Sequence, residues 1–473
     1  MKYKIKGILS VIGAWIHQFI LFPLFVISNM VPYLISHLHN TKDSSLTQND
    51  GFFFSPVTNM EMSICCFFSG IFEKNLGLYP TIILGGILIS LGSFLLSICK
   101  YFYVDFIITI FYGLGFGICF MCAIKNACKY FPKRSGLISA ICGGFGGNMG
   151  SARCNLLLKL IINPKNKDPD ENNGIYEEDI AKNVKDYLLA YMYMGLIGTF
   201  FSILFIKKFK EEKNEIIEKE KILDLEENKD NDETNNSRYT IRELKDQSKK
   251  TENNENTKKE EEKLDELTKN DYCLELKIQL KNCRIYYILF IYFFATFSQS
   301  FLMTTAFVFG VYEKSICDSD FMSYTFFAMS LTGCIAGPIW GFLYDKIGFK
   351  ISLSLINILT MSNILSLLFT VKIKWLYAFN VVFNGNLNTG AFSFMFPRIS
   401  KVFGFKFASE IYGIIVLSIG FSSLLGSITF YFIQKSSFDY INPYYLVFFI
   451  GSFFNLISTL MCIFESDKTI YIN

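Results

Sequence analysis

The segment Gly341-Phe-Leu-Tyr-Asp345-Lys346-Ile-Gly348-Phe-Lys350 lies between two apolar runs and has a counterpart, Gly70-Ile-Phe-Glu-Lys-Asn-Leu-Gly77, earlier in the chain. These two segments are 271 residues apart. A second pair, Phe131-Pro-Lys-Arg134 and Phe396-Pro-Arg398, has a similar offset of 265 residues. Two short matches at nearly one offset indicate a duplicated unit. We therefore expect a fold built from two similar halves.

Apolar runs of membrane-spanning length flank these segments and recur along the chain. A helix needs about 20 apolar residues to cross about 30 Å of hydrocarbon. We expect spans near residues 8–35, 54–73, 78–99, 103–129, 136–162 and 187–206, and again near 285–311, 321–344, 350–371, 375–396, 409–433 and 443–464. The pattern predicts an all-α membrane protein with twelve transmembrane helices in two six-helix halves, 1–206 and 284–473, joined by a loop over 207–283.

The composition supports a lipid environment. Of the 473 residues, 51% are apolar and only 18% are charged. Residues 207–270 alone hold 20 Asp/Glu and 16 Lys/Arg, so the remainder is too poor in charge to be soluble. The net charge of +3 provides no basic face for nucleic acid. Most of the 13 cysteines fall inside apolar runs, which favours packing over disulfides. We expect no metal or other cofactor and no enzyme site.

The charged loop over 207–283 is rich in Lys, Glu and Asn and cannot bury enough apolar surface to fold alone. We expect a solvated, largely disordered cytoplasmic linker, with docking of a partner protein as the alternative. Slightly more Lys and Arg lie in the short segments on the side of the N-terminus, which favours cytoplasmic termini. The membrane itself, plasma or organellar, is left open.

The loop at 341–350 resembles the inter-span signature of the major facilitator superfamily. That resemblance implies a transporter whose halves rock about a central site. It assigns a gating role to Asp345, Lys346, Gly341 and Gly348, and to the loop residues Lys133 and Arg134. In the first-half copy Lys74 stands where the family has aspartate, and Glu73 comes one residue early.

A longer stretch is similar to the monocarboxylate transporter and oxalate/formate antiporter branch of that superfamily. It contains the turn Phe131-Pro-Lys-Arg134 and the glycine-rich run Gly143-Gly-Phe-Gly-Gly147. The resemblance implies a small organic anion as substrate. Gly337 stands where that branch carries an arginine, so a neutral or cationic solute stays open.

Ionisable residues deep in a span mark functional sites, because they are costly in lipid. His17, Glu61 and Arg153 are predicted to lie near the middle of the membrane. We expect Arg153 and His17 to bind substrate, and Glu61 with His17 to carry protons. For each of the three, a purely structural role is the alternative. Lys125 is expected to extend its amine to the membrane surface.

In the second half the polar candidates for substrate binding are Gln299, Asn384 and Asn388, with hydrogen bonding between helices as the alternative. We also expect the helix to break over Phe383–Gly390, because Asn and Gly favour breaks. The leading hypothesis is a secondary transporter of a monocarboxylate-like anion, coupled to protons or exchanging substrates. A carrier of a neutral or cationic metabolite is the alternative, and a membrane receptor or scaffold is the third.

Overall fold

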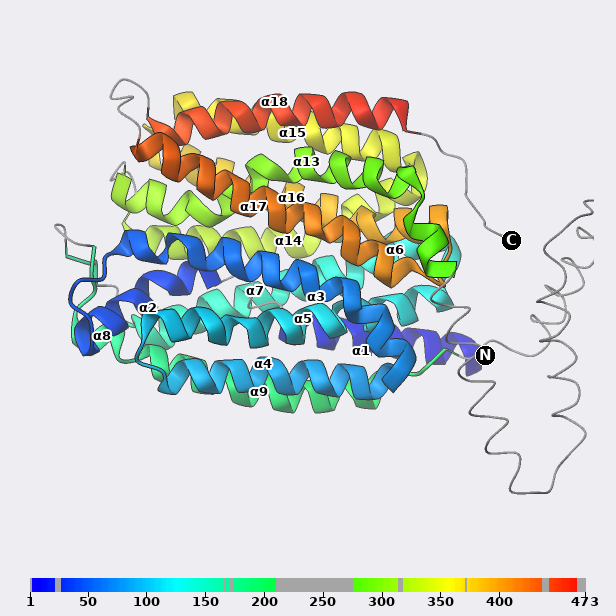
Figure 1. Ribbon diagram of the computed structural model, residues 1–473, viewed down its shortest axis with the longest axis horizontal. Helices are drawn as coiled ribbons and strands as arrows, with labels where there is room; N and C mark the ends of the chain where they lie inside the picture. Colours follow the sequence, from blue (N-terminus) through cyan, green and yellow to red (C-terminus); the bar gives the residue numbers. More distant parts are fainter. Residues whose placement is uncertain are drawn as a thin grey trace, which may run out of the picture. The chain divides into compact units, whose positions relative to one another are not determined.

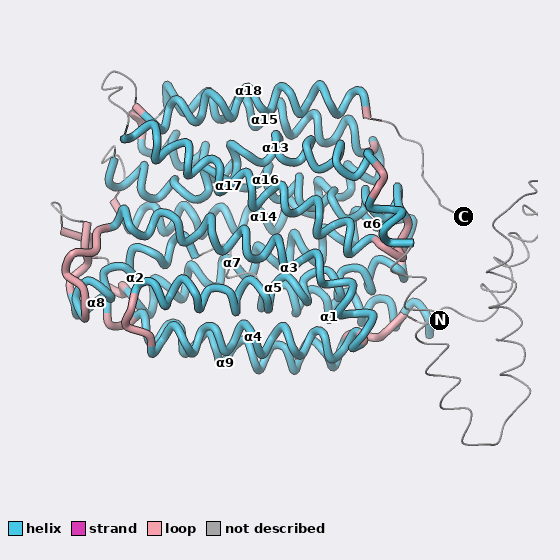
Figure 2. Tube along the Cα trace, in the orientation of Figure 1, coloured by secondary structure: helices cyan, strands magenta, loops and turns pink. Residues whose placement is uncertain are grey.

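The computed structural model describes the chain over residues 2–21, 27–165, 167–170, 174–209, 275–313, 318–370, 372–435 and 442–465. Every regular element in these ranges is helical (Figure 2). Contacts divide the chain into two units, Met1–Lys208 with Arg284–Asn473, and Phe209–Cys283. Nearly all of the predicted loop over 207–283 lies outside the described residues, so its disorder and its docking role stay predictions.

The first half contains nearly all of its predicted spans as helical rods. Its helices are α1 (Lys2–Leu21), α2 (Ile27–Thr41), α3 (Phe54–Leu76), α4 (Leu78–Ile98), α5 (Phe102–Tyr130), α6 (Ser135–Ser139), α7 (Gly146–Leu157), α8 (Glu178–Ala181) and α9 (Val184–Phe205). The first predicted span is divided between α1 and α2. The fifth is one rod in which the π-helical segments η4 (Ala140–Phe145) and η5 (Leu158–Ile162) flank α7.

The second half repeats this arrangement with longer continuous helices. They are α13 (Cys283–Val308), α14 (Ser319–Ile347), α15 (Phe349–Thr370), α16 (Lys374–Phe403), α17 (Ala408–Lys435) and α18 (Pro443–Phe464). The expected break over Phe383–Gly390 is wrong, since α16 runs through it. Asn386 contributes to continuity by hydrogen bonding to Thr332 of α14 at 3.1 Å.

Nine helices of the described residues are long and apolar enough to cross a membrane by length and composition alone. The other three predicted spans are α3, the α6–α7 rod and α16, which are helical but carry more polar residues. Together they give the predicted twelve spans. The described cysteines are all free thiols.

The duplicated loops adopt the same local structure. Gly77 ends α3 with φ +89°, and Gly348 ends α14 with φ +83°. Glycine enters this left-handed region without steric cost. In both loops the glycine N–H donates to the carbonyl four residues earlier, Glu73 or Tyr344. The sequence echo is therefore also a structural repeat.

The two halves meet along two helix pairs. In one pair, α3 of the first half packs on α17 of the second. In the other, α14 packs on α6, η4 and α7. Figure 1 shows α3 and α17, and α7 and α14, running alongside one another through the bundle. The space enclosed between these pairs positions the candidate site.

Candidate functional site

A cavity of about 130 Å³ lies between the halves. Both halves line it: α2, α3, α5, α6, η4 and α7 from the first, and α13, α14, α16 and α17 from the second. Its polar lining residues are Asn29, Ser55, Asn59, Ser139, Asn148, Ser151, Asn155, Ser300, Thr304, Ser330, Asn388, Thr389, Ser393 and Tyr412. None of the described residues that line it is Asp, Glu, Lys, Arg or His. The wall is therefore uncharged, with amides and hydroxyls set among apolar side chains.

Close helix contact brings the halves together on one side of the cavity, where α14 ends. A Cβ added at Gly341 would lie 2.5 Å from the Ala140 Cβ and 2.7 Å from the Gly136 carbonyl oxygen. Deeper along the same contact, a Cβ at Gly144 would lie 3.2 Å from the Gly337 Cα. Only glycine permits this approach without displacement of the helices.

Asp345 adds a polar contact at the same end, which we call the Asp345 end. Its carboxylate accepts hydrogen bonds from the backbone N–H groups of Gly136 at 3.1 Å and Leu137 at 2.9 Å. This joins α14 of the second half to α6 of the first. Of the other predicted gating residues, Lys346, Lys133 and Arg134 are exposed.

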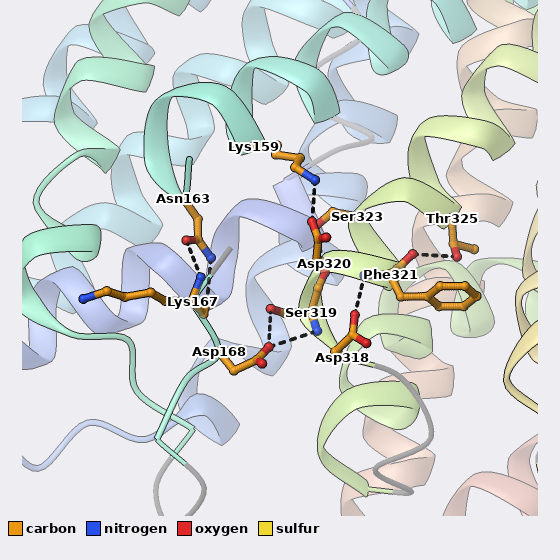
Figure 3. Close-up of polar contacts among 10 residues, drawn as sticks. All are labelled: Lys159, Asn163, Lys167, Asp168, Asp318, Ser319, Asp320, Phe321, Ser323 and Thr325. Carbon is orange, nitrogen blue, oxygen red and sulfur yellow. Dashed lines mark hydrogen bonds and ion pairs between the residues drawn. The ribbon is translucent and has the colours of Figure 1, made fainter. Parts of the chain in front are cut away.

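At the opposite end of α14, which we call the Asp320 end, charged and polar groups again join the halves (Figure 3). The Lys159 Nζ lies 2.5 Å from the Asp320 Oδ1 and 3.5 Å from the centre of the Tyr324 ring. The Ser319 hydroxyl donates to the Asp168 carboxylate at 2.9 Å. The cavity therefore has inter-half contacts on both sides, between the Asp320 end and the Asp345 end.

Asp318 fixes the start of α14 within the second half (Figure 3). Its carboxylate accepts from the Phe321 N–H at 2.6 Å and pairs with Lys374 at 2.7 Å. Burial acts to raise the pKa of Asp318, but the lysine and the N–H outweigh it, so this pKa lies below its ordinary value. The carboxylate is thus charged at neutral pH and caps the helix.

Arg153, predicted to bind substrate, lies outside the cavity wall. Its guanidinium lies 4.5 Å from the centre of the Phe19 ring and 5.8 Å from that of Tyr191. It also donates to the Cys154 sulfur at 3.6 Å. These contacts keep it inside the first half, between α1, α7 and α9. Stacking on aromatic faces stabilises a buried guanidinium without a carboxylate.

The other two predicted charged residues also lie outside the wall. His17 is fully buried in α1, and Glu61 of α3 packs against Gly113 of α5. No ion pair joins Glu61 to Arg153 among the described residues. The structure therefore does not assemble the three into one charged site around the cavity.

The predicted polar residues of the second half have different environments. Asn388 lines the cavity. Gln299 donates to Thr360 at 2.8 Å within the second half, and Asn384 is fully buried away from the cavity wall. Asn388 alone of the five residues predicted to bind substrate lines the described cavity.

Lys125 differs from its expectation. It is 6% exposed, and its amine pairs with Glu73 at 3.1 Å instead of reaching the membrane surface. Glu410 of α17 is fully buried beside Gly70, one turn before Glu73. Sequence reasoning missed this cluster because the partner carboxylates come from other helices.

The wall residues that sequence reasoning missed are uncharged. They include Asn29, Asn148, Asn155, Ser330 and Tyr412. The signal that could have found them is an amide or hydroxyl inside an otherwise apolar run, since such groups are also costly to leave unpaired in lipid.

The order and packing of the helices define the fold: the chain is a multi-pass helical membrane protein with the fold of major facilitator superfamily structures. It is similar to a structure of the major facilitator superfamily proton:xylose symporter XylE bound to 6-bromo-6-deoxy-D-glucose, with 12% identity, a TM-score of 0.62, and coverage of 97% of this chain and 94% of that chain. It is also similar to XylE from E. coli in a partially occluded inward-open conformation, with 12% identity, a TM-score of 0.58, and coverage of 97% and 98%.

A third structure, of a D-xylose-proton symporter, matches at 11% identity and a TM-score of 0.62 over 98% of this chain and 99% of that chain. No family model and no curated protein matches the sequence. At these identities the comparisons support the major facilitator fold alone, and the resemblance to the monocarboxylate branch stays a prediction.

Proposed function

We propose that the chain is a secondary transporter that carries a small uncharged polar solute through the cavity. The halves alternate between opening the Asp320 end and opening the Asp345 end. The fold and the contacts at both ends support this mechanism, in which substrate binds near the middle of the membrane between the halves. With cytoplasmic termini, as the sequence predicts, the Asp345 end faces the cytoplasm.

The observation that carries the choice of solute is the uncharged wall. An anion enclosed there would lose its hydration without gaining a cationic partner, which costs several kcal/mol even after relaxation. Amides and hydroxyls, in contrast, replace the hydrogen bonds that an uncharged polar solute leaves behind in water. The wall therefore favours the neutral alternative that Gly337 had left open.

A monocarboxylate-like anion is the second candidate. The turn Phe131-Pro-Lys-Arg134 and the glycine-rich run after it favour this candidate. It requires Arg153 to leave the rings of Phe19 and Tyr191 and reach the solute. Protons carried by Glu61 and His17 would drive either kind of transport.

Uptake into proteoliposomes tests the proposal. The full chain is given labelled D-xylose, because the solved neighbours are D-xylose and proton symporters, together with xylitol, glycerol, pyruvate and formate. Each solute is measured with and without a pH gradient. We expect saturable uptake of an uncharged solute, with less than a twofold change in the Arg153→Gln variant.

Two outcomes would contradict the proposal. Uptake of an anion that Arg153→Gln abolishes would support the second candidate. Saturable uptake of none of the five solutes would argue against transport of either class. The membrane insertion of Arg153→Gln is measured alongside, so that loss of protein is not read as loss of transport.

A further inference from the structure

Four hydroxyl groups of the cavity wall donate their protons within the protein. Thr304, Ser330, Thr389 and Ser393 each donate the hydroxyl proton to a carbonyl one turn earlier in the same helix, at 2.8–3.2 Å. A hydroxyl that donates in this way keeps only its oxygen lone pairs for other partners. These four positions can therefore only accept further hydrogen bonds, and the oxygens of Ser330 and Thr389 already accept one each, from Asn155 and Asn148.

Two amide oxygens add to these acceptors. Asn29 Oδ1 and Asn388 Oδ1 are buried and have no hydrogen-bond partner among the described residues of the protein. Both residues line the cavity, Asn29 from α2 of the first half and Asn388 from α16 of the second. A buried acceptor left without a donor costs about 1–3 kcal/mol, so each oxygen favours a ligand that brings one.

Asn29 is held in place by a relay that crosses between the halves. Its Nδ2 donates to Asn155 Oδ1 at 2.9 Å, and the Asn155 Nδ2 donates to Ser330 Oγ at 3.4 Å. Asn29 is 7% exposed and Asn155 6%. The relay uses one N–H of the Asn29 amide and fixes its orientation, while its oxygen accepts no hydrogen bond from the described residues.

Resting on the proposed function, we propose that Asn29 and Asn388 are specificity-determining residues that accept hydrogen bonds from two hydroxyl groups of one uncharged solute. The solute then joins the halves when it is bound, because its two acceptors belong to different halves. Asn155 is a positioning residue that orients Asn29.

Hydroxyl groups match this wall better than the alternatives do. A hydroxyl donates to the amide oxygens and also accepts from the donors of the wall, such as the phenol of Tyr412 and the Asn388 amino group. A carboxylate brings acceptors only, and would meet the acceptors of the wall. An ammonium group brings donors, but no described carboxylate of the wall offsets its charge.

The test pairs each residue with a hydroxyl of the solute. Uptake of D-xylose and of its single-deoxy derivatives is measured in proteoliposomes of the full chain. Wild-type protein should show a KM at least about fivefold higher for the deoxy derivatives that lack a hydroxyl bound by Asn29 or Asn388. Asn29→Ala should remove that discrimination at one hydroxyl, and Asn388→Ala at another. Asn155→Ala should weaken the discrimination at the Asn29 hydroxyl without removing it.

Matched controls lie on the same helices. Asn40→Ala on α2 removes a hydrogen bond to the Tyr176 carbonyl, and Asn386→Ala on α16 removes the contact with Thr332. Both side chains lie outside the cavity wall. These variants should keep the wild-type pattern across the deoxy series.

The outcomes separate the two proposals. The wild-type protein takes up D-xylose in the first outcome, and Asn29→Ala and Asn388→Ala keep the wild-type KM differences between D-xylose and its deoxy derivatives. That outcome would overturn this inference and leave the proposed function standing. A uniform rise in KM across the series would also overturn it, because that is the effect of a structural role. Uptake confined to anions, or to solutes without hydroxyl groups, overturns the inference; the anion result overturns the proposed function as well.

Discussion

Breaking the ion pair between Lys159 and Asp320 should open the Asp320 end of the cavity. The side chains are 16% and 30% exposed, between a surface pair and a buried one. Surface pairs are worth about 0–1 kcal/mol, and removal of one partner from a buried pair costs about 3–5 kcal/mol. We therefore expect Lys159→Ala or Asp320→Ala to cost the closed state about 1–2 kcal/mol. That shift favours the open state roughly 5–30-fold.

The assay is thiol labelling of a cysteine placed in the cavity wall at Ser151. Protein in nanodiscs is treated with a bulky maleimide, and the labelling rate of the parent without Ser151→Cys is subtracted. We expect a rate increase of about 5–30-fold for each single variant, because access is proportional to the open population. In the double variant Lys159→Asp with Asp320→Lys, which exchanges the two charges, the labelling rate should return most of the way to that of the parent.

The matched control is Lys167→Ala, which breaks an exposed ion pair with Asp179 on the same side of the molecule but within the first half. Its labelling rate should stay unchanged. The reasoning would be refuted by single variants of Lys159 and Asp320 that label at the rate of the parent. It would also be refuted if the exchanged pair labelled as fast as the single variants, since charge pairing would then not close this end.

Three further predictions follow from the packing. Gly341→Leu should prevent closure at the Asp345 end, because even a Cβ at position 341 would lie 2.5 Å from the Cβ of Ala140. Overpacking of this kind costs about 1–3 kcal/mol. Transport should therefore fall at least fivefold, while the helical content stays constant. Asp345→Ala removes two hydrogen bonds between the halves and should raise wall labelling severalfold, whereas Asp345→Asn, which keeps one acceptor, should raise it less. Glu465→Gln should lower the free energy of unfolding by about 3–5 kcal/mol, measured by thermal melting, because it removes the buried carboxylate that pairs with Arg398 and Arg284.

The sequence was sufficient for the spans because each helix must bury its own backbone groups in lipid. The predicted span 443–464 is α18 to the residue. The prediction failed at α16, where Asn and Gly residues suggested a break. Helix propensity is a weak local preference, and contacts such as Asn386 with Thr332 override it. Such contacts join residues far apart in the chain, which a reading of local pattern does not reveal.

Contacts between distant residues also explain why the depth and charge of a residue were poor guides to the lining of the cavity. A buried charge must be stabilised by something, and the sequence does not show by what. Arg153 is stabilised by the rings of Phe19 and Tyr191, and Lys125 by Glu73. Once a charge has such a partner inside one half, its burial within a span no longer requires a substrate.

The spans that fall short of the hydropathy of a membrane helix are a better guide to this cavity. The three predicted spans outside the nine apolar helices are α3, the α6–α7 rod and α16, and all three line the cavity. Their polarity comes largely from amides, hydroxyls and glycines, which are stabilised neither by lipid nor by a packed apolar interface. A helix can keep such residues in a membrane only where another surface satisfies them, and in an alternating-access protein that surface is the other half or the solute. Low hydropathy in a span that must still cross the membrane therefore indicates a helix that lines the cavity, even where no charge is present.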